Sequence, residues 1–181
     1  MNLAFEREDV ERELTAAAIE VLETMFFASL EKLEAGAVFD GTAGRIGAAL
    51  SFHGACKGSL SISLDRKAAH EFTASFFGEN VTSDDGLGEA TLGPDDDAAV
   101  MAEIANMVCG AMLSRLERKA IFALGTPTPL APGAEPMGWI EKDIALNDSI
   151  LRLAFSLDRT GWANREDFAD CVDFADCAVP Q

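Results

Sequence analysis

The chain has 181 residues, 31 of them acidic and 14 of them lysine or arginine, so its formal net charge is −17. A hydrophobic fraction of 49% and 12 phenylalanines are enough to build a core, which excludes a chain that is disordered throughout. So negative a protein repels phosphate groups, and nucleic acids and anionic membrane surfaces are therefore excluded as partners.

The N-terminal segment is charged from Glu6 onward, unlike a signal peptide, and no apolar run approaches the roughly 20 residues that a membrane span needs. Four cysteines are present: Cys56, Cys109, Cys171 and Cys177. They form no CxxC pair and are interpreted as free thiols in a reducing compartment. We therefore expect a cytoplasmic protein.

Hydrophobic periodicity predicts a long helix, a β-hairpin and a short helix in the first half of the chain. These are residues 6–33, strands at 46–52 and 60–64, and residues 66–77. Gly36 follows the first helix as a stop signal. Asp65 is a suitable N-cap for the short helix, and Gly78 closes it.

The second half is predicted to contain a helix followed by three strands. The segments are a loop at 79–94, a helix from Asp95–Asp97 to about Lys119, a short strand at 120–125, a proline-broken loop at 126–133, and strands at 139–146 and 149–157 joined by a turn at Asn147-Asp148. The order suggests two similar halves, each placing a long helix on part of a shared sheet, which is an α+β arrangement. We expect one domain over residues 1–160 and an acidic tail over 161–181.

Acidic residues are concentrated in two places. Between Ala68 and Ser114 there is no lysine or arginine but there are nine carboxylates, and in the tail Asp167–Cys171 recurs as Asp173–Cys177. The first stretch is interpreted as a solvated face, with a partner-selecting surface or a divalent-cation site as the alternatives. For the tail we favour a docking or frayed segment over a metal site, because thiolates and carboxylates suit different ions.

The common catalytic motifs are missing from the sequence. It contains no phosphate-binding glycine loop, zinc-protease motif or nucleophile elbow. His53 is expected in the hairpin loop, and neither His53 nor His70 has an obvious nucleophile as partner.

The helix ending near Lys119 is more informative, because it combines two stripes at helical spacing. The apolar stripe is Met101, Ile104, Val108, Met112 and Leu116, and the second stripe is Glu103, Asn106, Gly110 and Ser114. Glu103 and Asn106 therefore project side by side, and Gly110 leaves the ridge open to an approaching surface.

The segment Glu103–Gly110 resembles the ExxNxxxG helix of the CheC/CheX/FliY family of chemotaxis phosphatases. The family pattern continues to a proline a little over twenty residues after the asparagine, and Pro127 and Pro129 bracket that position. The first helix, the hairpin and the short helix are similar to CheX-type members in the same order, so the resemblance spans residues 10–157. Because the first helix has no ExxN, the chain resembles CheX-type members, which carry a single site.

The resemblance implies a CheC/CheX-like fold and a phosphatase acting on a CheY-like response regulator phosphorylated on aspartate. Asn106 would orient the attacking water and Glu103 would dock to a lysine of the regulator, with Gly110, Pro127 and Pro129 as partner-binding residues. The chain would need no cofactor of its own, because Mg²⁺ would come with the regulator, and a homodimer is expected by analogy.

The sequence departs from the family at Ala99, where an aspartate or serine is common. The alternative function is therefore a non-catalytic interaction module that binds a regulator or a chemotaxis or flagellar-switch component. A metal-binding protein that uses Asp95–Asp97 or the tail is a third interpretation.

Overall fold

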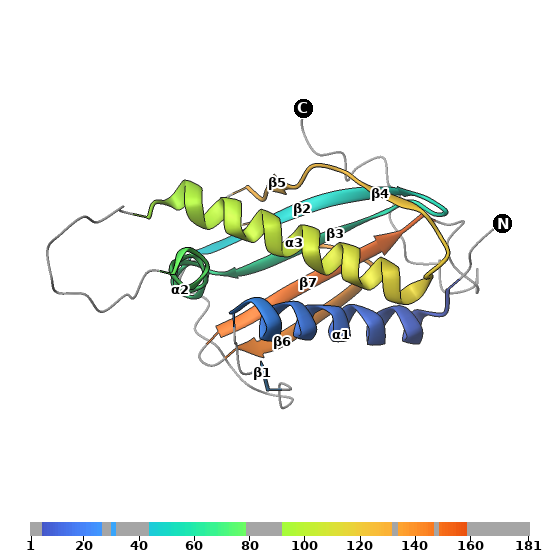
Figure 1. Cartoon of the computed structure of the whole chain (residues 1–181), viewed down its shortest axis with the longest axis horizontal. Helices are drawn as coiled ribbons and strands as arrows, with labels where there is room; N and C mark the ends of the chain where they lie inside the picture. The colour runs from blue at the N-terminus through green and yellow to red at the C-terminus, as the bar shows by residue number, and fades with distance from the viewer. Residues whose placement is uncertain are drawn as a thin grey trace, which may run out of the picture.

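The computed structural model describes residues 5–26, 30–31, 44–78, 92–131, 134–146 and 149–158. Three helices and seven strands follow one another in these ranges (Figure 1). In chain order they are α1 (Arg7–Phe26), β1 (Leu30–Glu31), β2 (Arg45–Gly54), β3 (Gly58–Asp65), α2 (Arg66–Phe77), α3 (Pro94–Leu116), β4 (Phe122–Leu124), β5 (Thr128–Pro129), β6 (Ile140–Leu146) and β7 (Ser149–Leu157).

The strands form one antiparallel sheet in the order β1-β6-β7-β3-β2-β4, with β5 also paired to β2. Helices α1 and α3 run antiparallel over one face of this sheet, and α2 packs against the start of α3 (Figure 1). The expected α+β class with an antiparallel sheet is confirmed. The expectation of two similar halves stays a prediction.

Alternating apolar residues of the long strands face the helices and make the core, as strand periodicity requires. Leu50 of β2, Leu60 of β3 and Phe155 of β7 are neighbours across the sheet and are at most 3% exposed. The Phe155 ring also stacks on Phe52 with 5.5 Å between centroids. Burial of a side chain of this size stabilises a fold by about 1.5–3 kcal/mol, so this layer anchors the helices on the sheet.

An ion pair also ties α1 to the sheet. The Lys142 ammonium on β6 lies 2.6 Å from one carboxylate oxygen of Glu11, and the other oxygen accepts a 2.9 Å hydrogen bond from Arg7. The hydrogen bonds from Arg7 and Lys142 hold the pKa of Glu11 below its ordinary value. The long first helix therefore has both an apolar and a polar contact with the sheet.

The opposite face of the sheet is covered by the chain that approaches β6. Glu135 lies 3.6 Å from Arg45 of β2 and 2.9 Å from Arg152 of β7. Leu130 donates a hydrogen bond to the carbonyl of Gly47, and a Cβ added at Gly47 would lie 2.9 Å from the Leu130 side chain. A small residue is therefore needed there, and this segment covers part of the second face, on which Ser51 and His53 stay exposed.

The structure corrects several predicted boundaries. The first helix ends at Phe26 rather than near residue 33, and Leu30 pairs with Leu146 of β6 in a strand. The third helix begins at Pro94 and ends at Leu116, three residues before Lys119. The predicted strand at 120–125 is shortened to 122–124, and His53 lies in β2 rather than in the hairpin loop.

Other predictions agree with the structure or fall outside it. The predicted Asp65 cap is confirmed, because its carboxylate accepts a hydrogen bond from the Ala68 amide, and Gly78 ends α2 with a left-handed φ of 73°. Gly36, the loop at 79–91, the turn at 147–148 and the tail over 161–181 lie outside the described residues.

Candidate functional site

The candidate site lies on α3, whose ends are fixed by its sequence. Pro94 occupies the first helical turn, where its missing N–H costs nothing, and the Asp96 carboxylate accepts a 2.8 Å hydrogen bond from the Gly93 amide. Acidic side chains at this end also suit the helix dipole. The described part of the chain holds no group of three or more His, Cys, Asp or Glu side chains that could bind a metal.

The inner side of α3 is buried more widely than one stripe. The predicted apolar residues Met101, Ile104, Val108 and Met112 are fully buried, and Leu116 is partly buried. Cys109 is also fully buried, which raises the pKa of its thiol to about 12 and keeps it protonated. By length and composition α3 could cross a membrane, but a core helix passes the same test.

The outer side of α3 carries the predicted polar stripe. Glu103 and Ser114 are exposed, whereas Asn106 and Gly110 are half-buried. Neither the Glu103 carboxylate nor the Asn106 carboxamide has a hydrogen bond or ion pair with a described residue. Both groups are therefore available to a partner, and their spacing of one helical turn places them on the same side.

Gly110 is not required by the packing of the chain itself. A Cβ built on Gly110 would approach only the Leu124 side chain, at 3.7 Å, which is an ordinary contact. Glycine in the middle of a helix costs about 0.5–1 kcal/mol relative to alanine. The packing of the described residues therefore leaves room for a methyl group at Gly110.

The two predicted prolines lie on the strand side of α3. Pro129 is in β5, exposed and opposite Ala48 of β2, and Pro127 is half-buried just before β5. Both β4 and β5 pack against α3. The structure therefore brings this segment to the flank of the helix that carries Glu103 and Asn106.

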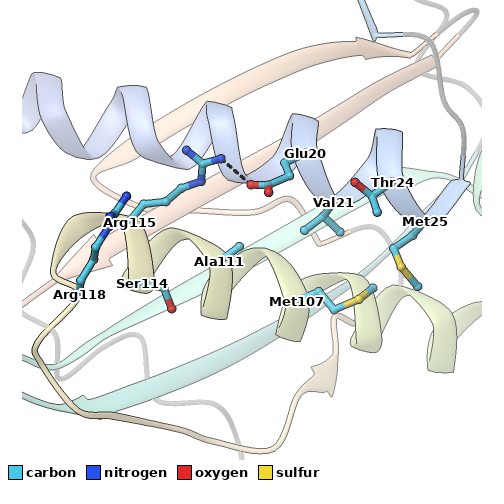
Figure 2. Close-up of a pocket in the computed structure, with 9 residues that line it drawn as sticks. All are labelled: Glu20, Val21, Thr24, Met25, Met107, Ala111, Ser114, Arg115 and Arg118. Atoms are coloured by element: carbon cyan, nitrogen blue, oxygen red, sulfur yellow. Dashed lines mark hydrogen bonds and ion pairs between the residues drawn. The ribbon is translucent and has the colours of Figure 1, made fainter.

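Two hollows border the polar stripe, and they share Ser114 and Arg118. The larger, about 550 Å³, lies between α1 and α3 (Figure 2). It is lined by Glu20, Val21, Thr24, Met25, Met107, Ala111, Ser114, Arg115 and Arg118. The smaller, about 350 Å³, lies between α3 and β4 and includes Gly110 and Phe122. The stripe is thus a ridge with a depression on each side of its C-terminal part, at Gly110 and Ser114, and neither hollow is lined by Glu103 or Asn106.

Ion pairs hold α1 and α3 together beside the larger hollow. The Arg115 guanidinium donates to the Glu20 carboxylate (Figure 2) and also lies 3.6 Å from Glu13. Glu20 and Glu13 raise the pKa of Arg115. This contact was not predictable from the sequence, because Arg115 and Glu20 are far apart in the chain and only the antiparallel packing of α1 and α3 brings them together.

Neither histidine belongs to the ridge. His53 is exposed on β2, and the His70 Nδ1 atom lies 3.1 Å from the Asp97 carboxylate. Asp97 is buried, so this contact gives its carboxylate a partner and fastens α2 to the first turns of α3. The aspartates at the start of α3 therefore have structural roles.

Comparison with known proteins identifies similar sequences and folds. Residues 46–137 match the family model described as chemotaxis phosphatase CheX. No curated protein matches the chain. The structure is similar to CheX from Desulfovibrio desulfuricans, with 17% identity over 82% of this chain and 99% of that one and a TM-score of 0.59.

Two further solved structures share the fold. CheX from Vibrio vulnificus has 22% identity over 80% of this chain and 94% of that one, with a TM-score of 0.56. The CheX of a CheX–CheY–BeF3–Mg²⁺ complex from Borrelia burgdorferi has 18% identity over 81% of this chain and 96% of that one, with a TM-score of 0.57. The fold is thus that of these CheX structures.

Proposed function

The chain belongs to the CheX family of chemotaxis phosphatases, and we propose that its substrate is a CheY-like response regulator phosphorylated on an aspartate. The observation that carries this proposal is the pair of unengaged side chains, Glu103 and Asn106, on the outer ridge of α3. The solved complex of a similar CheX with CheY supports a partner of this class.

The proposed reaction needs positioning more than a strong nucleophile. An aspartyl phosphate is an acyl phosphate, so water that attacks phosphorus in line breaks the P–O bond and releases phosphate and a free aspartate carboxylate. A carboxamide can accept from and donate to that water without titrating. We assign this role to Asn106, whose carboxamide has no hydrogen bond to any described residue.

Glu103 would fix the register of the two proteins. It lies one turn before Asn106 and is exposed, so its carboxylate can form a charge-assisted contact with a lysine beside the phosphorylated aspartate. Mg²⁺ is assigned to the response regulator as part of the substrate.

Three further residues are proposed to contact the partner. Gly110 leaves the ridge without a side chain one turn after Asn106, where the partner surface must approach closely. Pro127 and Pro129 belong to the segment beside α3 and would border the same interface.

Phosphate release from a phosphorylated receiver domain tests the assignment of Asn106. Asn106→Ala should abolish the stimulated release, and Asn106→Asp should also fail because a carboxylate lacks the donor and repels the phosphoryl group. Circular dichroism and the melting temperature should stay near those of the unmodified protein, because the half-buried amide has no described hydrogen bond to lose. Full activity of a folded Asn106→Ala variant would refute the mechanism.

Glu103→Ala should mainly weaken association with the receiver. Glu141→Ala is the matched control, because Glu141 is exposed on β6 and faces away from the helices. An affinity that changes equally in both variants would contradict the docking role of Glu103. If the receiver binds but phosphate release is not accelerated, the chain is the non-catalytic interaction module instead.

A further inference from the structure

The basic residues of this acidic protein are mostly engaged by carboxylates. Among the described arginines, ion pairs are formed by Arg7, Arg12, Arg45, Arg115 and Arg152. The exposed Arg118 side chain has no hydrogen bond or ion pair with a described residue. The Arg66 side chain, at the start of α2, also has none, but it lines neither hollow beside the ridge.

Arg118 is also placed on the candidate face. It lines both hollows that border the ridge, and Figure 2 shows it at the end of α3 beyond Ser114. The neighbouring Arg115 is neutralised by Glu13 and Glu20, so among the described residues that line the larger hollow Arg118 is the positive charge without a carboxylate partner.

The ridge therefore has opposite charges at its two ends. Glu103 lies thirteen residues before Leu116, the last residue of α3, which corresponds to about 20 Å along a helix that rises about 1.5 Å per residue, and Arg118 follows two residues later. A partner that places a lysine against Glu103 would meet Arg118 with a surface some 20 Å away. A carboxylate there gives two charge contacts of opposite sign, which fix one orientation and exclude the reverse one.

Resting on the proposed function, we propose that Arg118 is a specificity-determining residue that pairs with a carboxylate on the surface of the receiver domain. An acidic patch of the receiver domain therefore binds at the Arg118 end of the ridge, and the phosphoryl group of the same domain meets Asn106. Arg118 is too far from Asn106 to touch the phosphoryl group, so it contributes to association and partner choice rather than to the reaction.

Two variants of equal charge change test this inference. Arg118→Gln removes the proposed contact, and Lys119→Gln removes an adjacent exposed charge that lines neither hollow. The dissociation constant is measured with a receiver domain activated by beryllium fluoride and Mg²⁺, and KM and kcat are measured with the phosphorylated receiver.

Arg118→Gln should raise the dissociation constant and KM about fivefold, the upper range for an exposed ion pair, and leave kcat unchanged. It should also reduce the salt dependence of binding, whereas Lys119→Gln should change each value much less. Arg118→Glu should bind still more weakly and regain affinity with a receiver in which the contacting carboxylate is replaced by lysine.

Equal effects of Arg118→Gln and Lys119→Gln, or no effect of either, would overturn the role of Arg118 while leaving the phosphatase assignment intact. A receiver that binds through Arg118 without accelerated phosphate release would instead overturn the phosphatase assignment alone. A chain that binds no activated receiver would refute both.

Discussion

Replacing Gly110 by alanine should stabilise the protein and slow its reaction with the receiver at the same time. The added methyl group meets only the Leu124 side chain, at 3.7 Å, and alanine favours a helix over glycine by about 0.5–1 kcal/mol. For a chain of this length, 1 kcal/mol corresponds to a rise in melting temperature of about 2–4 °C.

The same methyl group would lie where the partner surface is proposed to approach α3. An extra methyl group in a close-packed contact costs about 1–3 kcal/mol, so kcat/KM should fall about 5-fold to 150-fold. The measurements are thermal unfolding by circular dichroism and phosphate release at several receiver concentrations.

Gly44→Ala is the matched control, because an added Cβ at Gly44 meets nothing within 4 Å and this position precedes β2, away from α3. It should leave kcat/KM unchanged. A Gly110→Ala protein with unchanged kcat/KM would show that the partner does not pack on this part of the ridge. A melting temperature of Gly110→Ala below that of the unmodified protein would show that the space beside Leu124 is smaller than the structure indicates.

Three further predictions concern stability and are measured by urea unfolding. His70→Ala should lower the free energy of unfolding by about 1–3 kcal/mol, because it leaves the buried Asp97 carboxylate without its partner. A decrease in this free energy as small as that of a typical surface substitution would contradict the role of His70. Asp65→Ala should cost about 1–3 kcal/mol, because it removes the cap on the Ala68 amide and the acceptor of the buried Ser149 hydroxyl, and Asp65→Asn should cost less because asparagine also caps helices. Burial raises the pKa of Cys109 to about 12, so as pH rises this thiol ionises in the unfolded chain before it ionises in the folded one. The free energy of unfolding should therefore fall as pH rises above about 9. The fall with pH should be smaller in Cys109→Ala, and an identical fall would refute the raised pKa of Cys109.

The strongly periodic parts of the fold were predictable from the sequence. Strand β7 agrees with its predicted range, 149–157, and the range and caps of α2 are confirmed. These segments have clear alternation or clear end signals, so local physical chemistry decides them.

Elements decided by distant parts of the chain were not predictable. Leu30 continues a helical spacing, yet it lies in a strand because β6 offers it hydrogen-bonding partners more than a hundred residues away. The predicted polar stripe on α3 is confirmed as an outward-facing stripe. That Arg115 is paired and Arg118 has no ion pair with a described residue could not be predicted, because it depends on which carboxylates reach the arginines after folding.

The position of β7 has a consequence for how the protein is made. β7 is the last described strand in the chain, yet in the sheet it lies between β6 and β3. Its residues from Arg152 to Leu157 pair with Ser63 to Gly58 of β3. Such contacts between distant segments form slowly, because a long loop must close before they can be made. During synthesis β3 therefore lacks one neighbour until residue 157 has left the ribosome, and the described part of the sheet is complete only at that late step.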